Sequence, residues 1–325
     1  MAAADGGRRA RLWVLVRALL GVVGVGVAVY IVRDVGIDAL QRAIVPALPW
    51  LPLAIALELA RIAMDAVSTR STLASRGEAV PWPALFGSHL VAFAVMGVAP
   101  AGRATAEAVK ASLLARWIGA PTAAAMGTAN QANTLLSSGT FSLLSALAAY
   151  LVSGPSTLTA LLVVHTVMMN ASGLALRVAA RYRKLQAWLQ RRFPKLAREI
   201  DTFGDASRET ALYPAWPVAS MMIGRAFQAA HFGVLAVAVG LSPSVLAALA
   251  LHGVYLVVAA LGVMIPGQLG ASEWGFVMAA ETLGTTEARA AAIALLAHAI
   301  QLILVAVGFV LLALWPERRK APIDG

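Results

Sequence analysis

The chain of 325 residues is 60% hydrophobic and 13% charged, with a formal net charge of +10 and a mean hydropathy of +0.77. This balance excludes an ordinary soluble domain and predicts an integral membrane protein. The absence of cysteine excludes disulfides, thiolate metal sites and cysteine nucleophiles. The basic residues lie between apolar stretches, which is typical of membrane topology and anionic-lipid contact rather than of nucleic-acid binding.

Apolar stretches of about 20 residues suffice to cross a hydrocarbon core of about 30 Å. Six segments reach that length: 12–32, 47–68, 121–152, 157–179, 212–240 and 287–315. We therefore expect an all-α integral membrane protein whose membrane domain covers 12–315, with no sizeable soluble domain at either end. Basic residues flank both ends of that domain and fill the segment 181–209. The tails 1–11 and 316–325 and this basic loop, predicted as an amphipathic helix on the anionic leaflet, should therefore be cytoplasmic.

Two further apolar regions, 84–117 and 243–283, are interrupted and do not fit as single crossings. Proline ends a helix and glycine permits a tight reversal; the breaks contain Pro100 and Gly102 in the first region and Pro266, Gly267 and Gly270 in the second. If both regions are re-entrant helical hairpins, every basic segment lies inside. A kinked ordinary helix is the alternative for either one.

The two breaks resemble each other in sequence. In each, a proline is followed by small or turn-forming residues and then, seven positions after the proline, by Glu107 or Glu273. This match predicts an inverted repeat of two oppositely oriented hairpins, an arrangement that transporters use around a site at the membrane midplane. Backbone that leaves the helix at membrane depth must be buried or line water, so the breaks predict a cavity.

The glutamates after the breaks should lie in the first turn of a returning helix, where an acid serves as a cap or as a functional group. We expect Glu107 and Glu273 to gate the cavity or exchange protons, because ionisable groups in a membrane usually mark a pathway or a partner. Arg103 and Lys110 flank Glu107 on one helical face. They either neutralise it or receive an anionic head group.

Other polar residues within the spans have two interpretations each. Glu58, Arg61 and Asp65 follow one stripe of a helix, which indicates first an ion-pair network and second a part of the substrate path. Arg225 stands in mid-span with no acid within a turn, so it must find a partner on another helix, a carbonyl or a lipid phosphate. The polar cluster comprises Asn130, Gln131 and Asn133, which either connect helices or line the cavity.

No metal-ligand spacing, cofactor motif or catalytic constellation is present, so we expect no metal, no cofactor and no enzyme.

With these residues in hand, the chain resembles a flippase-like family named after the transmembrane region of lysylphosphatidylglycerol synthases. Two stretches carry the resemblance, Pro100 to Gly119 and Pro266 to Gly284. Pro100, Gly102, Glu107 and Lys110 match the first motif, where an arginine is usual at the position of Lys110, and Pro266, Gly270 and Glu273 match the second. The chain departs from the family pattern at Asn130, Gln131 and Asn133, where a Glu-Arg pair and an Asp are common.

The resemblance implies movement of an anionic phospholipid or a polyprenyl- or hopanoid-type lipid between the leaflets of a bacterial cytoplasmic membrane. Arg103, Lys110, Arg61 and Arg225 would receive the head group, and Glu107, Glu273, Glu58 and Asp65 would gate the path or couple protons. The expected partners are membrane lipids, with a homo-oligomer or a lipid-biosynthesis partner possible in addition. A non-transporting scaffold of envelope biosynthesis and an intramembrane lipid-modifying enzyme remain alternatives; a soluble aminoacyl-transferase domain is not found, so lipid synthesis is not implied.

Overall fold

A computed structural model describes residues 30, 33, 37–99, 102–242 and 244–315. Throughout this described part the regular structure is helical, as predicted. Five of the six predicted spans coincide with helices that are long and apolar enough to cross a membrane. These are the continuous helical stretch from Ile37 to Ala79, which contains α3 (Leu51–Leu73), and the helices α6 (Ala120–Ser153), α7 (Thr157–Arg181), α10 (Ala215–Ala238) and α13 (Glu287–Ala313). The predicted span 12–32 and both predicted tails lie essentially outside the described residues.

Capping side chains fix where several of these helices begin. The hydroxyl of Ser156 accepts the backbone N–H of Thr159 at the start of α7, and Thr286 caps α13 in the same way. Such a cap satisfies one of the N–H groups that a helix leaves unpaired in its first turn. The short connection between α6 and α7 turns at Gly154, whose φ of +72° is readily adopted by glycine.

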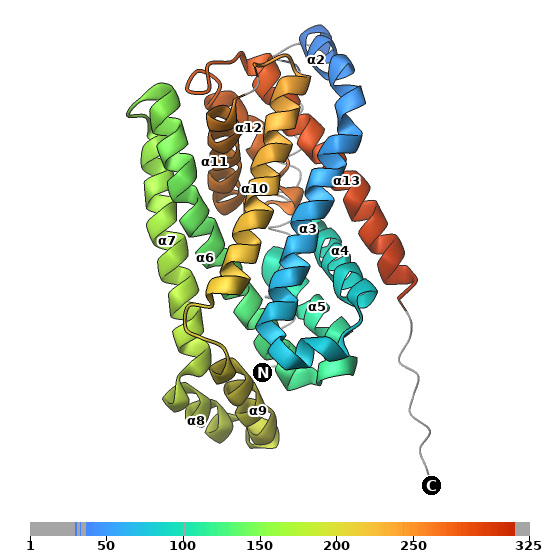
Figure 1. The fold of residues 1–325 in the computed structure, drawn as a ribbon, viewed down its shortest axis with the longest axis vertical. Helices are drawn as coiled ribbons and strands as arrows, with labels where there is room; N and C mark the ends of the chain where they lie inside the picture. Colours follow the sequence, from blue (N-terminus) through green and yellow to red (C-terminus); the bar gives the residue numbers. More distant parts are fainter. Residues whose placement is uncertain (1–29, 31–32, 34–36, 100–101, 243, 316–325) are drawn as a thin grey trace, which may run out of the picture.

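Both interrupted apolar regions form pairs of shorter helices. The first consists of α4 (Trp82–Val98) and α5 (Gly102–Ile118), which pack against each other. The second consists of α11 (Val245–Leu261), the short 3-10 turn η4 (Pro266–Gln268) and α12 (Ala271–Met278). In Figure 1 the long helices run along the longest axis of the bundle, α4 and α5 occupy one half of it, and α11 and α12 occupy the other. Pro100 lies outside the described residues.

The packing partners of the two halves correspond. α3 packs against α10, α4 packs against α13 as α11 does against α6, and α5 packs against α6 as α12 does against α13. Exchanging α3 to α6 with α10 to α13 therefore maps these contacts onto one another. The correspondence is one of contacts and not of lengths, because α5 has 17 residues and α12 has 8.

The basic segment 181–209 is not a single amphipathic helix. It forms α8 (Arg183–Arg192), a 3-10 turn at Pro194–Leu196 and α9 (Ala197–Glu209). α8 and α9 pack on each other, and α9 also packs on α6 and α7 at the lower end of the bundle in Figure 1. Pro194 explains the interruption, since it cannot supply the N–H that a continuing helix needs.

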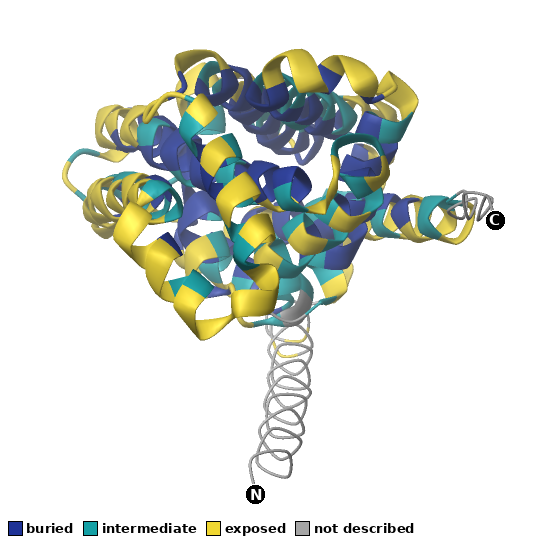
Figure 2. Cartoon of the chain, turned by 90° about the horizontal axis from the view of Figure 1, so that it is seen from below, coloured by how far each residue is buried: buried dark blue, intermediate teal, exposed yellow. Residues whose placement is uncertain are grey.

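The remaining 3-10 segments and the short helix α2 (Ile37–Ile44) extend α3 at its two ends, with η1 (Val45–Trp50) before it and η2 (Ala74–Ala79) after it. Figure 2 looks along the bundle and shows buried residues inside and exposed ones on the periphery. Large apolar side chains such as Leu147 and Val167 are exposed on that periphery. This outward apolar surface is what a lipid environment requires and water would oppose.

Candidate functional site

A cavity of about 350 Å³ lies inside the bundle. Its walls come from α3, α4, α5, α6, α7, α10, α11 and α13 together with the segment 262–268. Both breaks contribute: Ala99 and Gly102 line it from the first interrupted region, and Gly267 and Gln268 from the second. The sequence-based prediction that the breaks border a cavity is therefore matched by the geometry of the described residues.

The two breaks also touch each other. η4 packs against α4, and a Cβ placed on Gly267 would lie 3.5 Å from the carbonyl oxygen of Gly97. Gly267 and Gln268 both have a φ of +60°, a left-handed backbone that is common for glycine and unusual for glutamine. The segment 262–268 thus forms a tightly curved wall of the cavity directly opposite the end of α4.

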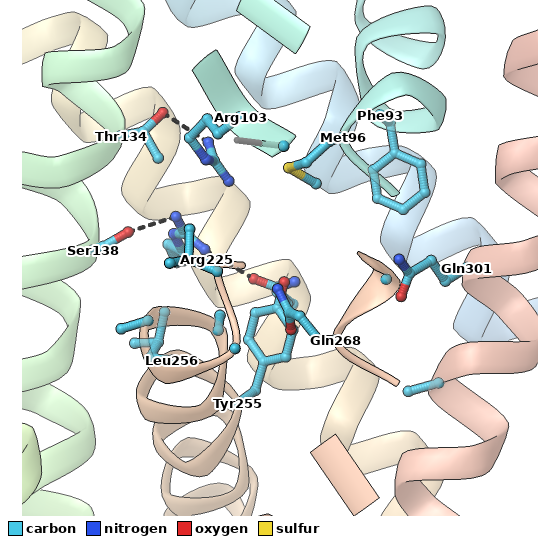
Figure 3. Close-up of a pocket in the computed structure, with 18 of the residues that line it drawn as sticks. Phe93, Met96, Arg103, Thr134, Ser138, Arg225, Tyr255, Leu256, Gln268 and Gln301 are labelled. Atoms are coloured by element: carbon cyan, nitrogen blue, oxygen red, sulfur yellow. Dashed lines mark hydrogen bonds between the residues drawn. The ribbon is translucent and has the colours of Figure 1, made fainter. Parts of the chain in front are cut away.

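Two arginines from different helices project into this cavity. Arg225 on α10 donates to the hydroxyl of Ser138 at 2.6 Å and to Oε1 of Gln228 at 3.1 Å. Arg103 on α5 donates to the hydroxyl of Thr134 at 3.1 Å. Figure 3 shows both guanidinium groups on the same side of the cavity, next to α6. Within the described part of the chain neither arginine forms an ion pair, so both charges keep only neutral partners.

Besides the two arginines and Glu58, neutral polar and aromatic groups line the cavity. Gln228, which accepts from Arg225, also lies 3.2 Å from Nε2 of His252. Tyr255 and Phe232 also line the cavity, with ring centroids 5.3 Å apart, and Gln301 of α13 lies across the cavity from the arginines in Figure 3. The N-terminus of α5 borders the cavity at Gly102, and its backbone dipole adds to the positive potential there. A cavity of this kind suits an anionic group with an apolar attachment.

The triad on α3 stands beside the cavity, and its arginine is paired with both of its acids. Arg61 is held by Glu58 at 2.7 Å and by Asp65 at 2.9 Å, and its guanidinium also lies over the ring of Phe93. Glu58 lines the cavity, whereas Arg61 and Asp65 do not. The geometry therefore matches the first interpretation of this stripe, an internal ion-pair network, although the network lies within one helix.

Glu107 lies beyond the first turn of α5, so it does not cap that helix as expected, and both Glu107 and Lys110 lie away from the cavity. Nζ of Lys110 is 2.8 Å from the carboxylate of Glu107, and the lysine side chain is 1% exposed. Neither residue lines the cavity. Lys110 therefore neutralises Glu107, which is the alternative that the sequence had left open for it.

The amide cluster on α6 is divided between two roles. Asn130 donates to Thr69, and Asn133 donates to Thr72 while accepting from Arg177. These bonds connect α6 with α3 and α7, as expected for polar groups that hold helices together. Gln131 instead lines the cavity.

Glu273 caps α12 and is bound on both oxygens. Oε2 accepts the backbone N–H of Gly270 at 2.8 Å, and Oε1 lies 2.6 Å from Nδ1 of His298 on α13. Nε2 of His298 lies 3.0 Å from the carbonyl oxygen of Gly267. The predicted cap is present, and a histidine that the sequence did not single out joins it to the break.

These features agree with the result of comparison with known families. The family described as the transmembrane region of lysylphosphatidylglycerol synthase matches residues 14–308. The chain belongs to this family. No curated protein and no solved structure matches it significantly.

Membership of the lysylphosphatidylglycerol synthase transmembrane-region family supports a multi-pass membrane protein related to lipid metabolism or transport. Of the positions that match the family motifs, Gly102 borders the cavity directly, and Glu273 stands behind its wall. Gly267, which follows the motif proline, also borders the cavity. Several lining residues were not predicted: Thr134, Ser138, Gln228, Tyr255, Gln268 and Gln301. One signal could have found two of them, because Gln131, Thr134 and Ser138 follow one another at helical spacing on a single face of α6.

Proposed function

We propose that the protein is a lipid flippase that moves an anionic lipid between the leaflets of a bacterial cytoplasmic membrane. The observation that carries this proposal is the pair Arg103 and Arg225, two guanidinium groups with neutral partners inside a cavity bordered by both helix breaks. Arg225 is buried and Arg103 is half-buried, and cations inside a membrane protein normally have a counter-ion. A phosphate from a lipid head group would supply it.

In this proposal α4–α5 and α11–α12 are re-entrant hairpins of opposite orientation. Their positions in opposite halves of the bundle and the corresponding packing of the two halves support this arrangement. Basic residues near both predicted tails and in 181–209 favour a cytoplasmic location for all three segments. Alternating exposure of the cavity would then follow from movement of one half against the other.

Arg103 and Arg225 are the proposed head-group residues, and Thr134 and Ser138 orient them. Arg61 is not assigned to the head group, because it already forms ion pairs with Glu58 and Asp65. Lys110 is assigned to Glu107. The alternatives of a non-transporting scaffold and of an intramembrane lipid-modifying enzyme make different predictions, because only a flippase transfers unchanged lipid between leaflets.

The test is leaflet exchange in proteoliposomes that carry fluorescent phosphatidylglycerol, read by an impermeant quencher. The variants are Arg103→Gln and Arg225→Gln, and the matched control is Arg76→Gln, whose guanidinium is exposed and pairs with Glu209. A hydrogen bond to a charged group contributes about 1.5–3 kcal/mol, so each cavity variant should slow exchange about 10- to 150-fold. The control should exchange at the native rate.

Fluorescent phosphatidylcholine and a polyprenyl phosphate serve as competing substrates. Faster exchange of either anionic lipid than of phosphatidylcholine, lost in both cavity variants, supports the proposal. Exchange no faster than in protein-free vesicles for all three lipids contradicts it and favours the scaffold. A change in the mass of the recovered lipid favours the enzyme.

A further inference from the structure

We infer that Glu273 and His298 together form a binding site for one exchangeable proton, and that this proton fastens the second helix break to α13. The inference deepens the proposed function, on which it rests for its role in transport. It starts from three contacts in the wall of the cavity: Gly270 N–H to Glu273, Glu273 to His298, and His298 to the carbonyl oxygen of Gly267.

Hydrogen-bond valence fixes the position of one proton. The carbonyl oxygen of Gly267 can only accept, so Nε2 of His298 must carry a hydrogen to bond it. Nδ1 of the same ring lies 2.6 Å from Oε1 of Glu273. A hydrogen bond at that position requires one further proton, either on Nδ1 with Glu273 ionised or on Oε1 with the imidazole neutral. Both descriptions hold the same single proton, and the pair is neutral overall.

Loss of that proton to water leaves one imidazole hydrogen for two acceptors. If the hydrogen stays on Nε2, the lone pair of Nδ1 faces the carboxylate of Glu273. If it moves to Nδ1, the bond to the carboxylate is kept and the lone pair of Nε2 faces the carbonyl oxygen of Gly267. A bond to a carboxylate is stronger than one to a neutral carbonyl. Deprotonation therefore releases Gly267.

Release of Gly267 would act on the cavity directly. Gly267 and Gln268 line the cavity, and so do Ala297, Ile300 and Gln301, which lie near His298 on α13. Gln268 is held with a φ of +60°, a conformation that persists in a non-glycine residue only when its surroundings impose it. The bond from His298 to the preceding carbonyl is one such constraint, so its loss should let the segment relax.

The pair is isolated from other ionisable groups. Glu273 is 1% exposed and His298 is 9% exposed. Among the described residues, neither of them has an ion pair or hydrogen bond with a titratable or charged group on the elements around them. Those groups are His89 on α4, Asp38 and Arg42 on α2, Glu58, Arg61, Asp65 and Arg70 on α3, Arg225 and His231 on α10, His252 and Tyr255 on α11, Glu281 after α12, and Glu287 and Arg289 on α13. The proton of the dyad is therefore not shared with another ionisable group.

The native chain contains no cysteine, so a single spin label can report on the break without transport. We would attach a nitroxide at Gln268→Cys in the full chain, reconstituted in phosphatidylcholine vesicles, and record its mobility while the pH is raised across neutrality. A label at Val245→Cys, which is 78% exposed at the start of α11, controls for general effects of pH. The variants are Glu273→Gln and His298→Ala.

The two variants should act in opposite directions. The side-chain amide that Glu273→Gln introduces can donate to Nδ1 of His298 and still accept from Gly270, so this variant imitates the protonated dyad and should keep the label immobile at every pH. His298→Ala removes the bond to Gly267 and should leave the label mobile at every pH. The chain with both native residues should change from immobile to mobile as the pH rises.

A label that responds to pH identically in all three backgrounds overturns the inference. So does a label as mobile in Glu273→Gln as in His298→Ala, because a purely structural pair would be loosened by either change. Lipid exchange without a pH-dependent label leaves the proposed function standing and removes the dyad from it. A pH-dependent label in a protein that exchanges no lipid keeps the proton site and removes the flippase.

Discussion

Thr134 and Ser138 lie one helical turn apart on α6, and each accepts a hydrogen bond from an arginine of a different helix. A single face of α6 thus positions Arg103 from α5 and Arg225 from α10. The two hydroxyls leave the positive charges uncompensated while satisfying part of their hydrogen-bonding capacity. This arrangement explains how two cations can be held in a cavity and still be available to an anionic ligand.

Replacing Ser138 should weaken the fold through Arg225. Ser138→Ala removes an acceptor of a buried guanidinium, and we expect the free energy of unfolding to fall by about 1–2 kcal/mol. Ser145→Ala is the matched control, because Ser145 is buried on the same helix and its hydroxyl has no hydrogen-bond partner among the described residues. Denaturant unfolding in detergent micelles measures both. Equal losses in the two variants would contradict the role given to Ser138.

Asn133 should matter more for stability than Asn130. Asn133→Ala breaks a bond to Thr72 and one from the buried Arg177, whereas Asn130→Ala breaks a bond to Thr69. Because bonds to charged groups contribute more, we expect a loss of about 2–4 kcal/mol for Asn133→Ala and about 1 kcal/mol for Asn130→Ala. Thermal unfolding in micelles gives the order. The reverse order would show that Arg177 is held sufficiently by its bonds to Thr210 and Ala211.

Substitutions at Glu107 and Lys110 should have non-additive effects on the free energy of unfolding and no effect on lipid exchange. Lys110→Met leaves the carboxylate without its partner, and Glu107→Gln leaves a lysine that is 1% exposed without a counter-charge. Breaking one side of a buried pair costs about 3–5 kcal/mol, while replacing both sides is often nearly neutral. The double variant should therefore be more stable than either single one in the same unfolding assay.

Lipid exchange by that double variant provides the second half of the prediction. Since neither residue lines the cavity, the folded double variant should exchange phosphatidylglycerol at the native rate. If the double variant has the same unfolding temperature as the native protein but exchanges no lipid, Glu107 and Lys110 belong to the substrate path, as the family resemblance implies.

The long helices were predictable because local signals determine them. Apolar length, together with a proline or glycine at the ends, placed α6 and α7 within a residue or two of their observed bounds. The breaks at Gly102 and Gly267 were visible for the same reason, since proline and glycine act on the backbone wherever they occur. The fold of the basic segment 181–209 was less predictable. Pro194 marks where it divides, but the packing of α9 on α6 and α7 joins residues far apart in sequence.

The site was predictable only in part because its contacts join residues far apart in sequence. Arg225 could be identified by the absence of an acid nearby, but its partner Ser138 lies 87 positions away. In the sequence, Lys110 and Arg103 look alike, because each is a basic residue within a turn of Glu107. Only the tertiary packing places Lys110 in a buried ion pair and Arg103 in the cavity. His298 carries no sequence motif, and its role becomes visible when α13 is placed against α12.

Close contact between α4 and α13 should depend on Gly308. A Cβ at this position would collide with the carbonyl oxygen of Leu90, which is backbone and cannot move aside cheaply. Overpacking of this kind costs about 1–3 kcal/mol, so Gly308→Ala should lower the free energy of unfolding by that amount. Gly127→Ala is the control, because its Cβ would meet nothing closer than 3.5 Å.

At Gly127 an alanine should not lower the free energy of unfolding. The residue lies inside α6, where alanine favours the helix over glycine by about 1 kcal/mol. Gly127→Ala should therefore be neutral or stabilising, while Gly308→Ala loosens the wall that α4 and α13 share around the cavity. Parallel unfolding curves in micelles separate the two. Similar stability of both variants would mean that α13 can shift away from α4 without loss, and the close packing at Gly308 would then have no role in holding the bundle together.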